Sequence, residues 1–275
     1  MKNLLLLLVV LVIAGCSTSF LYNHIDWLAV EYVEDYVELD ESQEQLLSDK
    51  VAQLTAWHRQ QEIPSYVAYL DELLAVQPSA FTLEQMRYHE DKIRTYTKRL
   101  ANQVAPEIAL LASQLSDQQV EEFMDSLRVR HTKYKNRYQD LSDSEIKQRY
   151  QARIEKNLKR WLGRLTEAQQ QVLSRWVDGL QITSRDWIAH QTKVRVEVNA
   201  LLEQRNNPDV FNPRLNTLIS APESYYSATL ANKIEHNREV ARVHLTEVIN
   251  LMTERQTEHF RDEVTDWKQL AMDIQ

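Results

Sequence analysis

The sequence contains very little glycine and almost no cysteine, and each shortage excludes a class of fold. Of 275 residues, three are glycine and one is cysteine. Only Gly163 and Gly179 follow residue 15, where average usage would give about eighteen. Strand turns and phosphate-binding loops depend on glycine, so β-rich, Rossmann and P-loop folds are excluded. One cysteine permits no disulfide within the chain, so stability must come from helix packing.

The sequence also lacks an apolar run long enough to cross a bilayer. The longest run, residues 4–14, has eleven residues, whereas a membrane-spanning helix needs about 20. Met1-Lys2-Asn3 gives this run a basic start, and small residues follow it. This arrangement is typical of a signal peptide. We therefore expect residues 1–15 to be removed from the mature protein.

The four residues Ile13-Ala14-Gly15-Cys16 resemble a lipobox, the site at which bacterial lipoproteins are cleaved and acylated. The resemblance implies a lipid on Cys16 that tethers the protein to a membrane. Residues 16–22 would then form a lipidated N-terminus with a short tether. Ser17 resembles the enteric-type sorting pattern for the periplasmic face of the outer membrane, because Asp at that place retains lipoproteins at the inner membrane.

Helix starts recur along the rest of the chain. The pattern is an apolar residue, then Asp, Ser or Thr, two free positions, and Gln or Glu, which is the capping box. It occurs at Leu39-Asp40…Gln43, Phe81-Thr82…Gln85, Leu115-Ser116…Gln119, Leu141-Ser142…Glu145, Leu165-Thr166…Gln169 and Met252-Thr253…Gln256, and Ser220…Glu223 also fits.

Helical apolar spacing continues between these starts. We expect helices near residues 20–37, 41–60, 65–76, 83–112, 117–138, 143–163, 167–205, 223–250 and 254–273. Pro106 should break or kink the fourth. Residues 206–222 hold three of the six prolines and should form an irregular loop or hinge. The predicted fold is all-α: residues 23–275 form an elongated multi-helix bundle of antiparallel amphipathic helices after the lipoprotein signal peptide.

Charge is distributed unevenly. Without Lys2, 31 basic and 40 acidic residues remain, yet residues 125–164 hold twelve bases against five acids. Residues 20–50 hold nine acids against Lys50. Both segments can be solvated helix faces, or they can pack together. The functional alternative is a surface for an anionic partner, and its candidate residues are Arg149, Arg153, Lys156 and Arg160. An exported, acidic chain is not expected to bind nucleic acid.

Catalytic motifs are missing from the sequence. It contains no HExxH and no G-x-S-x-G. His236 with Glu239 and His244 with Glu247 share a predicted helix, but the pattern is a weak one for metal. No catalytic residue, cofactor or metal ion is predicted. Glycosidase-like carboxylate pairs leave a glycan-active enzyme as an alternative.

Two aromatic clusters have both structural and binding interpretations. Trp57-His58-Arg59 followed by Pro64-Ser65-Tyr66 forms a corner, with Pro64 expected to start a helix. An arginine over an aromatic ring would explain this corner structurally, and a ligand site is the alternative. Tyr225-Tyr226 is either a buried helix entry or an exposed interaction site.

Two resemblances complete the interpretation. The lipobox, the stretch from Leu21 to Leu28, the Trp57 corner and the capping boxes together resemble an uncharacterised family of helical lipoproteins from Gram-negative bacteria. Leu165-Thr166-Glu167-Ala168-Gln169 and Met252-Thr253-Glu254-Arg255-Gln256 are similar to the LTxxQ motif of Spy and CpxP-type periplasmic proteins. That local resemblance implies an ATP-independent chaperone or envelope-stress protein, although helix capping alone gives the same pattern.

The leading hypothesis is a non-enzymatic binding or scaffold protein of the cell envelope. The membrane would be contacted through the lipid on Cys16. The further partner would be an envelope protein or an anionic envelope component. The chaperone is the alternative.

Overall fold

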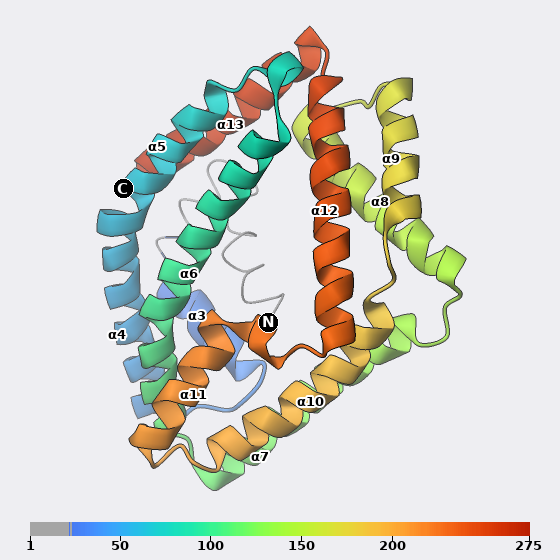
Figure 1. Ribbon diagram of the computed structural model, residues 1–275. Helices are drawn as coiled ribbons and strands as arrows, with labels where there is room; N and C mark the ends of the chain where they lie inside the picture. Colours follow the sequence, from blue (N-terminus) through green and yellow to red (C-terminus); the bar gives the residue numbers. More distant parts are fainter. Residues whose placement is uncertain (1–21, 23) are drawn as a thin grey trace. The chain divides into compact units, whose positions relative to one another are not determined.

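The computed structural model describes residue 22 and residues 24–275 (Figure 1). Over these residues all regular secondary structure is helical, which confirms the predicted all-α class. The predictions for the signal peptide, Cys16 and Ser17 fall on residues 1–21, outside the described part. Among the helices of that part, none combines the length and apolar character needed to span a bilayer.

The chain divides into two compact units. One combines the residues up to Val76 with Glu258–Gln275, and the other holds Gln77–Thr257. The first unit contains α3 (Ile25–Glu34), α4 (Glu41–Trp57), a π-helical turn (His58–Glu62) and α5 (Ile63–Leu74). It also contains α13 (Glu254–Ile274) from Glu258 onward. An ion pair of 2.6 Å between Asp71 and Lys268 joins α5 to α13.

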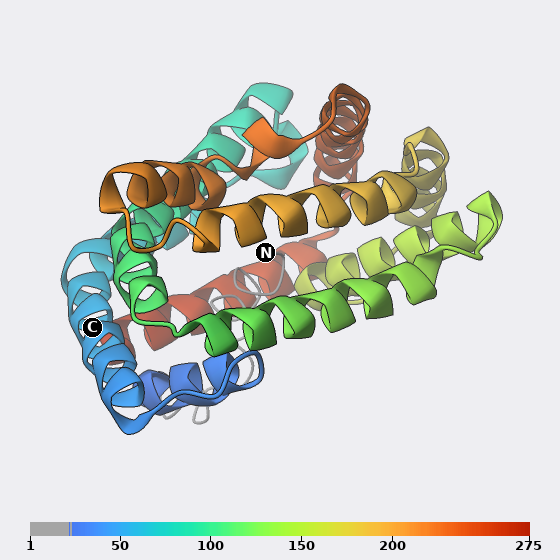
Figure 2. The same ribbon diagram turned by 90° about the horizontal axis from the view of Figure 1, so that it is seen from below.

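The second unit is built from pairs of packed helices. After the 3-10 turn Pro78–Ala80 come α6 (Leu83–Ser113), α7 (Asp117–Tyr138), α8 (Asp143–Leu162), α9 (Glu167–Gly179), α10 (Ser184–Leu202), α11 (Pro208–Ser220), the 3-10 turn Pro222–Tyr225 and α12 (Ala228–Asn250). Helix α6 pairs with α11, α7 with α10, and α9 with both α8 and α12 (Figures 1 and 2).

Two hydrophobic clusters fill this second unit. One lies among α8, α9 and α12 and includes Leu162, Trp176 and Val248. The other lies among α6, α7, α10 and α11 and includes Val120 and Phe211. The apolar faces of amphipathic helices supply each cluster. The helical spacing of apolar residues in the sequence therefore produces a packed core.

The capping boxes are confirmed at six of the seven predicted places. Side-chain and backbone bonds of the box are present at Asp40, Thr82, Ser116, Ser142, Thr166 and Thr253. The prediction of a capping box at Ser220 is wrong, because Ser220 ends α11 and its hydroxyl donates to the Asn216 carbonyl. The following helix instead starts at Ser227, whose side chain accepts from the Leu230 N–H.

The predicted single helix over residues 167–205 is wrong, since residues 180–183 separate α9 from α10. Side chains from other helices compensate for the lost helical hydrogen bonds. The Asn237 amide bonds the backbone N–H and carbonyl of Gln181 at 2.7 and 2.8 Å. Lys147 donates to the Asp178 carbonyl and His236 bonds the Gly179 carbonyl. These partners are distant in sequence, so local spacing does not reveal the break.

The prediction of an irregular segment at 206–222 is also wrong, because most of it forms α11. Pro208 occupies the start of the helix, where its missing N–H costs nothing. Phe211, Leu215 and Leu218 then form a buried stripe at helical spacing and hold α11 against α6. A hinge here stays a prediction. Pro106 does not break α6, which continues to Ser113.

Candidate functional site

The four predicted anion-binding residues lie on one face of α8. Their spacing of four, three and four residues places Arg149, Arg153, Lys156 and Arg160 along one side of the helix, and all four are exposed. The other side of α8 carries the buried residues Ile146, Tyr150, Leu158 and Leu162. The hydrophobic face therefore fixes the orientation of the helix, and the four bases, named here the α8 basic face, point to solvent.

Aromatic rings hold three of these cations. The Arg149 guanidinium lies 5.5 Å from the Tyr138 ring centroid, and Arg153 lies 5.4 Å from that of Tyr150. Arg160 lies 5.7 Å from the Trp161 centroid. Such stacking restrains a guanidinium while leaving its N–H groups available to an anion.

The ends of the α8 basic face differ in their further partners. Arg149 also donates a 2.9 Å hydrogen bond to the Arg137 carbonyl at the end of α7. Within the described residues, Arg153 and Lys156 form no ion pair with a carboxylate, whereas neighbouring Lys159 pairs with Glu155 at 2.6 Å. The centre of this face therefore keeps its positive charge uncompensated by direct contacts.

The Trp57 corner has the arginine-on-ring packing that its structural interpretation predicts. The Arg59 guanidinium lies 5.2 Å from the Tyr22 ring centroid, and the Tyr22 hydroxyl bonds His58 Nδ1 at 2.8 Å. Burial lowers the pKa of His58. Pro64 stands in the first turn of α5 as expected, but the chain continues from α4 to α5 through a π-helical turn. At this connection the sequence predicted a corner between two separate helices.

The two histidines of the weak metal-binding pattern, His236 and His244, have other partners. His236 Nε2 lies 2.9 Å from the Gly179 carbonyl, and His244 Nδ1 lies 2.8 Å from the Val240 carbonyl. His244 also stacks on Trp176. Across residues 22 and 24–275, no group of three His, Cys, Asp or Glu side chains is placed to hold a metal ion.

Tyr226 belongs to an aromatic cluster that the sequence did not predict. Its ring packs edge-on against Trp187 and His190, with centroids 5.3 and 5.0 Å apart. Burial and the nearby Lys193 lower the pKa of His190. On α7, burial together with the cation of Arg195 lowers the pKa of His131 to about 4. Both imidazoles therefore favour their neutral forms.

The two boxes that resemble LTxxQ meet inside the second unit. Gln169 and Gln256 are 0% and 4% exposed, and each amide nitrogen donates to the other amide oxygen, at 3.0 and 2.9 Å. Each amide oxygen also accepts from its own helix cap, Thr166 or Thr253. Gln256 additionally donates to the Arg164 carbonyl at 2.9 Å. Sequence patterns locate both boxes but not this reciprocal pairing.

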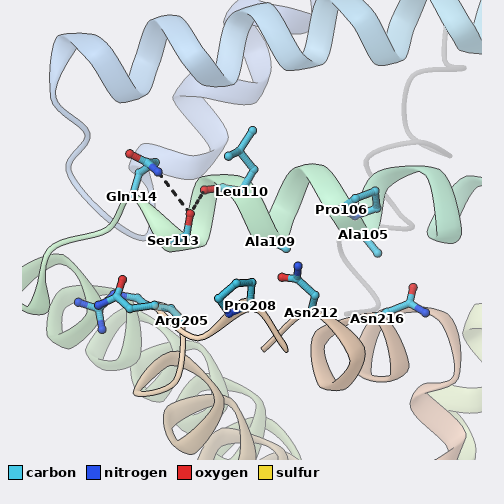
Figure 3. Close-up of a pocket in the computed structure, with 11 residues that line it drawn as sticks. Ala105, Pro106, Ala109, Leu110, Ser113, Gln114, Arg205, Pro208, Asn212 and Asn216 are labelled. Atoms are coloured by element: carbon cyan, nitrogen blue, oxygen red, sulfur yellow. Dashed lines mark hydrogen bonds between the residues drawn. The ribbon is translucent and has the colours of Figure 1, made fainter. Parts of the chain in front are cut away.

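A groove between α6 and α11 is a second candidate site that the sequence missed (Figure 3). It encloses about 600 Å³. Ala105, Pro106, Ala109 and Leu110 of α6 line it, and Asn212 and Asn216 of α11 lie opposite. Figure 3 shows the Asn212 amide directed at α6. Because residues 206–222 are predicted as irregular from the sequence, this helix-bounded groove could not be foreseen.

Arg205 closes one end of the groove. Its side chain is 9% exposed and forms an ion pair with Asp117. It also donates to the Leu115 carbonyl at 2.9 Å and to the Leu202 carbonyl at 3.1 Å. Arg205 therefore ties the start of α7 to the end of α10.

Comparison with known protein families gives a match over most of the chain. A family model described as "Family of unknown function (DUF6279)" matches residues 35–230. This range includes the α8 basic face and the groove. No curated protein and no solved structure matches the chain.

Proposed function

Since this chain belongs to the DUF6279 family, whose function is unknown, we propose its role from its own residues. It is a lipid-anchored, non-enzymatic binding protein on the periplasmic face of the bacterial outer membrane. Its α8 basic face engages an anionic component of the envelope or an acidic surface of an envelope protein.

The anchor is supported by the lipobox-like residues 13–16 and by the position of Tyr22. Tyr22 is buried and bonds His58, so the body begins there. The six residue steps from Cys16 to Tyr22 can extend at most about 20 Å. A lipid on Cys16 therefore keeps this part of the first unit near the membrane, and Ser17 favours the outer membrane.

The single observation that carries the binding proposal is the accessibility of the cations on α8. Four bases share one exposed face, and three of them stack on aromatic rings. Restraint by the rings reduces the side-chain entropy lost on binding, while exposed clustered charge attracts an anionic partner. Charged partners of opposite sign recognise such a surface with strong dependence on salt.

The test is charge reversal followed by crosslinking in intact cells. We expect the variant with Glu at Arg149, Arg153, Lys156 and Arg160 to lose its dominant crosslinked partner and to retain wild-type helicity by circular dichroism. A matched control reverses four exposed bases elsewhere, namely Lys98, Arg99, Lys193 and Arg255. Both variants change net charge equally. Retention of the partner by the α8 variant, or equal loss in both, would eliminate this surface.

A periplasmic chaperone is the second candidate, and one observation favours it. The two boxes similar to LTxxQ are bonded to each other through buried glutamines, whereas the box Thr82…Gln85 lies on the surface. The discriminating assay is aggregation of an unfolded client at equimolar ratio. Unslowed aggregation would remove this candidate. Hydrolysis of peptidoglycan by the pure protein would instead establish a glycan-active enzyme.

A further inference from the structure

The groove between α6 and α11 has features of a binding site distinct from the α8 basic face. We propose that it binds an extended, uncharged polypeptide segment by hydrogen bonds to the main-chain amides of that segment. The inference does not depend on the anionic partner, because it involves other residues on other helices.

The wall formed by α6 is apolar from Ala105 to Leu110 and ends at the polar Ser113, whose hydroxyl donates to the Leu110 carbonyl. Ala105 and Ala109 are buried, whereas Pro106 and Leu110 are exposed one turn apart. Alanine leaves room for a ligand backbone to approach the helix closely. Exposed proline and leucine offer apolar surface whose burial favours binding. This wall suits a chain with small or apolar side chains.

The opposite side of the groove offers neutral amides. Asn206, Asn212 and Asn216 are exposed lining residues. Within the described part of the chain, none of their side-chain amides has a hydrogen-bond partner. A carboxamide both donates and accepts, so one asparagine can pair with the N–H and the carbonyl of a main-chain segment. No internal hydrogen bond has to break first.

Among the described residues that line the groove, Arg205 is the one cation, and its hydrogen-bond donors already have partners. The Arg205 guanidinium bonds two backbone carbonyls and Asp117. None of the described lining residues is acidic. The site therefore offers no unpaired charge for a charged ligand, and its chemistry matches an uncharged peptide backbone.

The spacing of the asparagines fits an extended chain. Asn212 and Asn216 are four residues apart on α11, a rise of about 6 Å. In an extended chain, residues that face the same way recur every two positions, about 6.6–6.8 Å apart. Two successive outward-facing backbone units can therefore meet the two amides in register. The buried stripe of Phe211, Leu215 and Leu218 fixes α11 against α6, so the register is preformed.

The experiment measures fluorescence anisotropy of a fluorescein-labelled octapeptide of alternating serine and valine, titrated with the purified full chain. Alternation of a β-branched residue favours the extended form. A second probe has the same sequence with alternate residues N-methylated, which removes N–H donors along one edge. Tetra-N-acetylchitotetraose, an uncharged glycan, serves as competitor.

We expect saturable binding of the unmethylated peptide and at least about tenfold weaker binding of the methylated one. The double variant N212L/N216L should also bind at least about tenfold more weakly, equivalent to about 1.4 kcal/mol. Asn→Gln at both positions should recover part of the affinity because it retains the amides. The control N136L, at an exposed asparagine of α7, should bind as the wild type does.

Three results would overturn the proposal: no saturable binding of the octapeptide, equal binding of the methylated probe, or equal affinity of the N212L/N216L and N136L variants. Displacement of the peptide by tetra-N-acetylchitotetraose would make the groove a glycan site instead. The charge-reversed α8 variant should bind the octapeptide normally, so failure of the anionic-partner hypothesis and failure of this one are distinguishable.

Discussion

Replacing Gln169 by methionine should destabilise the second unit much more than the same change in an exposed capping box. The Gln169 amide accepts from the Thr166 N–H and exchanges two bonds with Gln256. It also donates to the Val248 carbonyl at 3.3 Å. Methionine has similar volume and cannot make these bonds, so packing changes little while the polar partners lose their bonds.

The expected magnitude follows from the number of bonds. Net contributions of about 1 kcal/mol each, reduced by the apolar burial that methionine gains, give about 3 kcal/mol for Gln169→Met. Gln256→Met should cost a similar amount, about 3 kcal/mol, for the same reason. The two bonds between the glutamines are lost in either single variant. The double variant should therefore cost about 2 kcal/mol less than the sum of the single variants.

Urea unfolding provides the assay. Free energies of unfolding from linear extrapolation are compared for wild type, both single variants and the double variant. Tryptophan fluorescence, to which Trp161 and Trp176 of the cluster nearest the pair contribute, reports on tertiary packing, and circular dichroism reports on helicity. Gln85→Met is the matched control, because this glutamine belongs to a box on the surface. It should cost about 0.5 kcal/mol.

Two results would refute this reasoning. One is a cost for Gln169→Met no larger than that for Gln85→Met. The other is a coupling energy below about 0.5 kcal/mol, the lower limit for residues that interact directly. Either result would mean that the reciprocal amides contribute no more than ordinary capping.

Three other predictions concern separate parts of the chain. Cys16→Ala should move the protein from the membrane fraction to the released fraction on cell fractionation; unchanged fractionation would contradict lipid anchoring. Arg205→Met should lower the free energy of unfolding by about 2 kcal/mol in urea titrations, because two carbonyls and Asp117 lose their donor. Arg205→Lys should fail to restore it, because an ammonium lacks the guanidinium geometry. The pKa of His131 is about 4 in the fold against an ordinary 6.5, so the unfolded state takes up a proton first. Stability should therefore fall as pH drops from about 6.5 towards 4. Over this range the free energy of unfolding, measured in urea, should change less steeply with pH for His131→Gln than for the wild type. An equal dependence on pH would contradict burial of the neutral imidazole.

Local sequence signals predicted most of the helix starts because capping is a local interaction. Thr82 and Ser142 satisfy N–H groups three residues away, so four consecutive letters contain the information. The same holds for the α8 basic face, whose bases share a side through helix geometry alone. Its aromatic partner Tyr138 lies on a different helix and becomes visible only in the fold.

The features that escaped prediction depend on residues far apart in sequence. Asn237 satisfies the backbone of Gln181, so the break that follows Gly179 is stable although residues 180–183 contain no proline. Gln169 meets Gln256 across 87 positions. For α11, the prolines and asparagines outweighed the helical spacing of Phe211 and Leu215, although that spacing was present in the sequence.

The division of the chain into units has a consequence for the order of assembly. Helices α3 to α5 share a unit with α13 from Glu258 onward, whereas the whole of the other unit lies between them in sequence. Synthesis proceeds from the N-terminus, and compact units fold as they become complete. Residues 77–257 can therefore pack before the part of α13 that belongs to the first unit has been made. The earliest helices must wait for the latest, so the unit that begins first along the chain is completed last.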